Sequence, residues 1–85
     1  IKVETPDEIK FTVIDEVRKY CEEKEYQILL VDGVKVFFED GSALVRASNT
    51  GPNITTRFEA KTSSRLNEIQ GEFMGLIEVL KQNVL

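Results

Sequence analysis

The 85-residue sequence contains no histidine, no tryptophan and a single cysteine, Cys21. One thiol and no imidazole exclude an internal disulfide, a Cys/His zinc site and the histidine of a catalytic triad. Cys21 falls on the apolar side of a predicted helix, which favours a small buried hydrophobe over a reactive group. The lone thiol is consistent with a reducing compartment, and we expect the cytoplasm.

Long apolar runs and excess positive charge are also missing. No stretch approaches the roughly 20 apolar residues of a membrane span, and no signal-peptide pattern occurs, so we expect no membrane partner. The net charge is −4, with 11 basic and 15 acidic residues, which argues against general nucleic-acid binding. The length indicates one small domain, in which a deep internal active site is not expected. The start at Ile1, inside a strand-like stretch, suggests a piece of a longer protein.

The first of two predicted helices follows Pro6. Thr5 and Glu8 have the spacing of a capping box, and Pro6 suits the first helical turn. Apolar residues then recur at helical spacing, which predicts one buried face. They are Ile9, Val13, Val17, Tyr20 and Cys21, with Phe11 and Ile14 widening the stripe.

The second predicted helix begins after Thr62, which can cap it. Its apolar residues again share one helical face. They are Leu66, Ile69, Phe73, Leu76, Ile77, Leu80 and Val84. Gly71 and Gly75 interrupt this helix and suggest a close contact with a sheet.

Strand-like runs occupy the rest of the chain, at residues 1–5, 27–31, 34–39, 43–47 and 53–60. Asp-Gly pairs at 32–33 and 40–41 predict tight hairpins with positive φ. Alternation assigns one face to Val34, Val36, Phe38, Ile54, Thr56 and Phe58, and the other to Lys35, Phe37 and Glu39. The order β-α-β-β-β-β-α predicts an α+β fold, with a mostly antiparallel four- to five-stranded sheet and two amphipathic helices on one face.

Residues 46–52, RASNTGP, form a polar connection between the last two strands. All its small residues are turn formers, so an ordinary turn is one interpretation. The other is an oxyanion receptor. Arg46 and Ser48 share a face of an extended segment, Thr50 lies within reach, and Gly51 permits close approach. A guanidinium, hydroxyls and backbone N–H groups suit phosphate oxygens. The residues alone leave both interpretations open.

Residues 32–62 resemble the C-terminal domain of the α-D-phosphohexomutases, most closely the phosphomannomutase/phosphoglucomutase branch. The shared features are, in order, Asp32-Gly33, Asp40-Gly41, the pattern Arg-x-Ser-x-Thr-x-Pro at 46–52, the strand 57–60 and the cap Thr62. The resemblance implies a TBP-like domain. It also implies that residues 1–85 are one domain, the fourth and substrate-phosphate-binding domain of a larger enzyme.

The family interconverts hexose 1- and 6-phosphates through a phosphoserine and a bisphosphate intermediate, with Mg²⁺ bound outside this domain. The resemblance implies that Arg46, Ser48, Asn49 and Thr50 bind the phosphate that does not react. It implies no catalytic or metal-binding residue here, so the isolated chain is expected to be inactive. The implied partners are a hexose phosphate and the other domains of the enzyme.

Two alternatives remain open. Arg57 either supports the loop or is a solvated strand residue paired with Glu59 or Glu39. The whole chain could instead be a non-enzymatic α+β module that binds a protein or RNA through its sheet. The acidic charge argues against RNA, as does the lack of an aromatic pair on an exposed strand face, where only Phe37 is expected.

Overall fold

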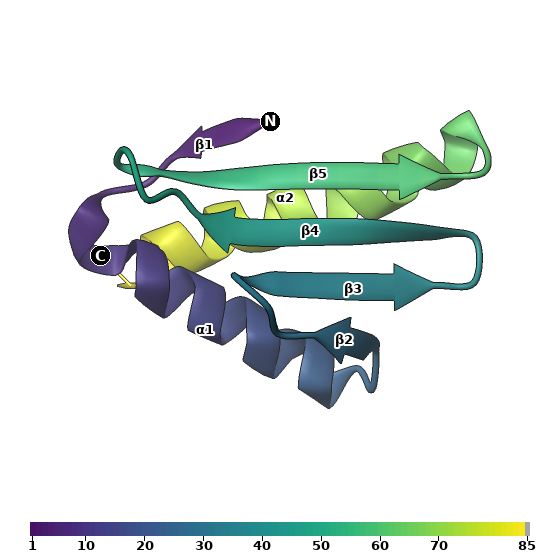
Figure 1. The fold of residues 1–85 in the computed structure, drawn as a ribbon, viewed down its shortest axis with the longest axis horizontal. Coiled ribbons are helices and arrows are strands. Elements are labelled where there is room, and N and C mark those ends of the chain that lie inside the picture. The colour runs from purple at the N-terminus through teal and green to yellow at the C-terminus, as the bar shows by residue number, and fades with distance from the viewer. Residues whose placement is uncertain (85) are drawn as a thin grey trace.

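Five antiparallel strands form one sheet, and two helices pack on one of its faces (Figure 1). A computed structural model describes residues 1–84. The elements are β1 (Lys2–Glu4), α1 (Asp7–Glu23), β2 (Gln27–Leu29), β3 (Val34–Phe38), β4 (Gly41–Ala47), β5 (Asn53–Ala60) and α2 (Ser63–Val84). The strand order across the sheet is β1-β5-β4-β3-β2. The predicted α+β class, element order and helical layer are confirmed.

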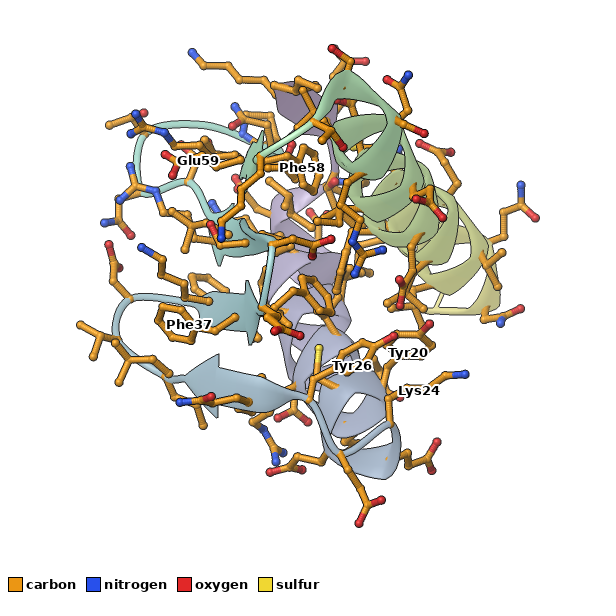
Figure 2. The ribbon with its side chains drawn as sticks, turned by 90° about the vertical axis from the view of Figure 1, so that its right-hand side faces the viewer. Tyr20, Lys24, Tyr26, Phe37, Phe58 and Glu59 are labelled. Atoms are coloured by element: carbon orange, nitrogen blue, oxygen red, sulfur yellow. The ribbon has the colours of Figure 1, made fainter. Side chains whose placement is uncertain are left out.

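The core lies between the sheet and the two helices. Side chains alternate along the strands as predicted, so Val34, Val36 and Ile54 are buried while Lys35 and Phe37 face outward. Figure 2 shows Phe58 on the helical side of the sheet and Phe37 and Glu59 on the open side. The buried apolar residues are Val3, Ile9, Val13, Val17, Cys21, Val34, Val36, Ala43, Val45, Ile54, Ile69, Phe73 and Ile77.

Two side chains, one in α1 and one just before it, depart from their predicted roles. Phe11 is 64% exposed, because two residues along a helix rotate a side chain about 200° away from the face of Ile9. Thr5 does not cap the helix, so the predicted capping box with Glu8 is wrong. Its hydroxyl is buried and donates to the carbonyl of Val3 at 3.0 Å, and the extended Pro6 stands between it and the helix.

Cys21 is fully buried in this core, as its place on the apolar stripe predicts. Burial raises the pKa of its thiol to about 11. A thiol with such a pKa stays protonated near neutral pH, and the thiolate is the nucleophilic form. Cys21 is therefore a packing residue.

The two Asp-Gly pairs behave differently. Asp32 has φ 56° and Gly33 has φ 125°, as a left-handed turn requires. At the second pair the prediction of positive φ is wrong. Gly41 is already the first residue of β4, paired with Phe38. Its need for glycine is steric, because a Cβ there would lie 2.5 Å from the carbonyl oxygen of Glu59.

Helix α2 begins as predicted. The backbone N–H of Arg65 donates to the hydroxyl of Thr62 at 3.1 Å, which confirms the cap. Its buried face carries Ile69, Phe73 and Ile77, with Leu76 and Leu80 packed beside them. The predicted position of Val84 on this stripe lies outside the described side chains.

The predicted contact between the α2 glycines and the sheet is wrong. Gly71 and Gly75 are exposed, and a Cβ added at either would have no heavy atom within 4 Å. They alternate with the buried Ile69, Phe73 and Ile77 along the helix and lie on the opposite, exposed side. Each costs about 1 kcal/mol of helix stability relative to alanine.

A tyrosine pair joins the C-terminal end of α1 to α2 (Figure 2). The hydroxyls of Tyr20 and Tyr26 both donate to the Glu72 carboxylate, at 2.8 and 2.7 Å. The two rings meet edge to face, with their centroids 6.4 Å apart, and Tyr26 meets Phe38 in the same way. This cluster satisfies both phenols and fixes the start of β2 beside the helices.

These contacts predict a loss of stability at high pH. Burial and the Glu72 carboxylate raise the pKa of Tyr20 to about 12, and Glu72 with burial raises the pKa of Tyr26 further. A tyrosine of the unfolded chain ionises near pH 10. The two tyrosines therefore leave the free energy of unfolding unchanged below pH 10 and lower it as the pH rises from 10 to 12.

Near-ultraviolet absorbance checks this directly, because the chain has only these two tyrosines. We expect phenolate to appear only as the circular dichroism of the fold is lost. Tyr26→Phe should make the decline of stability with pH shallower. Phenolate formation near pH 10 in a folded chain would contradict the prediction.

Candidate functional site

The loop between β4 and β5 is a short, closed hairpin connection at one end of the sheet (Figure 1). The backbone N–H of Ser48 donates to the carbonyl of Asn53 at 2.9 Å, and that of Asn53 donates to Gly51 at 2.9 Å. Thr5, just before α1, donates its N–H to Pro52 at 2.8 Å. Backbone hydrogen bonds thus hold both ends of the loop.

Two of the predicted site residues lie together inside this loop. The hydroxyls of Ser48 and Thr50 are hydrogen-bonded at 3.2 Å, and the N–H of Thr50 also points at the Ser48 oxygen, at 3.2 Å. Asn49, between them, is exposed, and its side chain has no hydrogen bond within the described residues. The loop therefore presents two hydroxyls and an amide at one exposed tip.

The fourth predicted residue, Arg46, is on β4, and its guanidinium has no hydrogen bond to either hydroxyl within the described residues. Its Nη1 lies 2.9 Å from a carboxylate oxygen of Asp32, in the connection between β2 and β3. Both side chains are exposed. The structure thus places Arg46 beside the loop and within an ion pair that the sequence analysis did not predict.

Arg57 takes no part in the loop. It is 77% exposed, and its Nε lies 3.6 Å from a carboxylate oxygen of Glu59 on the same strand. Of the two interpretations left open for this residue, the structure supports the solvated strand residue paired with Glu59.

Lys10 of α1 contacts the loop backbone, and the sequence alone did not identify it as part of the site. This lysine of α1 is only 6% exposed. Its ammonium donates to the carbonyls of Ser48 at 2.6 Å and Gly51 at 3.1 Å, and it pairs with Asp7 at 2.8 Å. All three ammonium protons thus have partners. A signal existed, because Lys10 shares the helical stripe of Val13 and Val17.

Electrostatically, the loop combines two cations with two nearby carboxylates. Lys10 brings a buried positive charge to the loop backbone, and Arg46 brings an exposed one to its edge. Asp7 and Asp32 each partly offset one of them. Such a loop can bind an anion through hydroxyls, amides and a guanidinium, with a moderate net charge that permits release.

Comparison with known proteins decides which family this architecture represents. Residues 1–76 match the family model described as "Phosphoglucomutase/phosphomannomutase, C-terminal domain". The chain belongs to this phosphohexomutase C-terminal domain family. The resemblance inferred from residues 32–62 is confirmed.

Individual relatives of this phosphohexomutase domain agree. The chain is 40% identical over 73 residues to a "Phosphomannomutase/phosphoglucomutase" of Pseudomonas syringae pv. tomato, covering 86% of the chain and 16% of the relative. It is 45% identical over 67 residues to a "Phosphoglucomutase" of Neisseria meningitidis serogroup A, covering 78% and 15%. The chain therefore spans about one sixth of the length of these curated relatives.

The phosphohexomutase fold is also found in a solved structure. A crystal structure of a phosphoglucomutase/phosphomannomutase family protein from Burkholderia thailandensis superposes with a TM-score of 0.72 at 32% identity. It covers 85% of this chain, which covers 16% of that protein. Sequence and structure comparisons thus support the same α+β domain.

Two further findings bound the chemistry of this phosphohexomutase domain. Among the described residues, no three histidine, cysteine, aspartate or glutamate side chains gather in a way that could hold a metal ion. Neither helix, as far as the structure describes them, combines the length and apolarity that crossing a membrane requires.

Proposed function

We propose that this chain binds the non-reacting phosphate of a hexose phosphate. In this proposal, residues 1–85 are the C-terminal, fourth domain of a cytoplasmic phosphohexomutase that interconverts hexose 1- and 6-phosphates through a phosphoserine and a bisphosphate. The observation that carries the proposal is the β4–β5 loop. In a member of this family, it presents the hydrogen-bonded hydroxyls of Ser48 and Thr50, and it directly follows the end of β4 that carries the exposed Arg46.

Each residue has a distinct part in holding the phosphate. Arg46 supplies charge and a planar set of N–H donors that matches phosphate oxygens. Ser48 and Thr50 exchange their mutual hydrogen bond for bonds to the phosphate, and their hydroxyls add no charge. Asn49 contributes its side-chain amide or its backbone N–H. None of these groups breaks a bond.

The mechanistic contribution is positioning. A phosphoryl group passes between oxygens that must lie in line, so catalysis depends on how firmly both partners are held. A sugar with phosphates at both ends can bind in two directions. Holding the distal phosphate at this loop determines which end faces the phosphoserine.

Magnesium enters the proposal only outside this chain. The family resemblance implies Mg²⁺ in the complete enzyme, where it would neutralise charge on the transferred group. The described residues do not fit such a site, because no suitable group of three ligands gathers among them. The other domains of the enzyme would supply the ion and the phosphoserine.

Titration of the ¹⁵N-labelled 85-residue chain with inorganic phosphate tests the proposal. We expect amide shifts at residues 48–50 and at the Arg46 Nε–H, with saturation in the millimolar range for one exposed site. Arg46→Ala should remove the shifts, and Arg57→Ala, which deletes an equal charge outside the loop, should retain them. Flat shifts at residues 46–50, or equal shifts in Arg46→Ala, would overturn the proposal.

A further inference from the structure

We propose that Asp32 is a positioning residue for Arg46, one that orients the guanidinium for phosphate before the substrate arrives. The proposal rests on the proposed function for its ligand. The pair joins residues 14 apart in sequence, one in the β2–β3 connection and one on β4. Figure 1 shows this connection at the same end of the sheet as the β4–β5 loop.

The contact leaves the guanidinium available for an anion. Asp32 accepts a hydrogen bond from Nη1 alone, at 2.9 Å. Within residues 1–84, Nε and Nη2 of Arg46 have no hydrogen-bond partner. Two parallel N–H groups of an arginine can bind two oxygens of one phosphate. Asp32 therefore restrains the guanidinium through Nη1 and leaves Nε and Nη2 available to phosphate.

The backbone of the turn that carries Asp32 packs against the Cβ of Arg46. Asp32 has φ 56° and Gly33 has φ 125°, so the backbone folds back at this point. A Cβ on Gly33 would lie 2.6 Å from both the Cβ of Arg46 and the carbonyl oxygen of Val45. The backbone of the turn thus packs directly on β4. The next residue, Val34, pairs with Val45, so the register of β3 and β4 keeps the carboxylate beside the arginine.

Two effects of the Asp32 carboxylate oppose each other. It restrains a long side chain, and a restrained arginine loses less freedom when phosphate binds. It also adds a negative charge near the anion. Because both side chains are exposed, solvent weakens the repulsion between the Asp32 carboxylate and the phosphate. Phosphate can also bind Nε and Nη2 without displacing Asp32 from Nη1. We infer that restraint is the larger effect.

Three variants of the chain test this inference, with inorganic phosphate as the probe. Asp32→Ala should weaken phosphate binding by about two- to fivefold, the range for an exposed ion pair. Asp32→Asn keeps an oxygen that can accept from Nη1, so its loss should be smaller. Glu23→Ala removes the same charge from the exposed end of α1 and should leave binding unchanged.

A second measurement does not depend on phosphate. In the ligand-free chain, ¹⁵N relaxation of the Arg46 Nε–H should report a guanidinium that is more mobile in Asp32→Ala than in the wild type or in Glu23→Ala. In a full-length enzyme carrying this chain, Asp32→Ala should raise KM and leave kcat nearly unchanged.

The outcomes separate the two proposals. Equal or tighter phosphate binding by Asp32→Ala would show that the carboxylate competes with phosphate, and would overturn the positioning role. Unaltered Arg46 mobility would overturn it too. If phosphate fails to shift residues 46–50 of the wild-type chain, the proposed function fails, while the relaxation of Arg46 still decides whether Asp32 holds it.

Discussion

Replacing Arg46 with alanine in a full-length phosphohexomutase that carries this chain is expected to lower kcat/KM for hexose phosphate about 10²- to 10³-fold. Arg46 brings an exposed guanidinium to the edge of the loop, whereas the ammonium of Lys10 already bonds to Asp7 and two carbonyls. Arg46 is proposed to hold the phosphate that does not react, so its loss removes a charged hydrogen bond and misplaces the reacting end of the sugar, which together typically cost about that much. Steady-state kinetics with hexose phosphate measure the loss.

Two further variants identify the cause of the loss. Arg46→Lys keeps the charge but not the planar fork, so its kcat/KM should fall between those of the wild type and alanine. Arg57→Ala removes an arginine that is 77% exposed and paired with Glu59 on the open face of the sheet. It should leave kcat/KM unchanged. Equal losses for Arg46→Ala and Arg57→Ala would show that only overall charge matters.

The fold was predictable because its information is local. Alternation along residues 34–38 and 53–58, and apolar spacing along both helices, determine which faces are buried. The errors arose where a residue type serves more than one purpose. Gly41 looked like a turn glycine but is required by the approach of the Glu59 carbonyl. Thr5 looked like a cap but bonds to Val3.

The candidate site was predictable only within its own loop. Ser48 and Thr50 are neighbours in sequence, so their proximity follows from a short connection. Lys10 and Asp32 reach the loop from other elements, 38 and 14 residues away from their partners. No periodicity within one segment reports such contacts. What the sequence did carry was an oddity, a lysine on an apolar helical stripe, and its explanation required the tertiary fold.

Replacing Lys10 with methionine is expected to lower the free energy of unfolding by about 1–3 kcal/mol and to weaken phosphate binding. Methionine fills a similar volume but donates no hydrogen bond. The carbonyls of Ser48 and Gly51 then lose their donor in a partly buried setting, which costs about that amount. Asp7 is well exposed, so water can solvate its freed carboxylate, and the penalty stays below that of a stranded buried charge.

Urea denaturation measures the stability, and phosphate titration of residues 48–50 measures the loop. Lys19→Met is the matched control, because it deletes the same charge from the same helix at an exposed position paired with Asp15 and Glu16. It should change stability by less than about 1 kcal/mol. Equal losses in both variants would mean that Lys10 acts through charge alone. A stable Lys10→Met chain with unchanged phosphate shifts would mean that the hairpin bonds of the loop suffice. We expect neither outcome, because the two carbonyls that accept from Lys10 flank the hydroxyls proposed to bind phosphate.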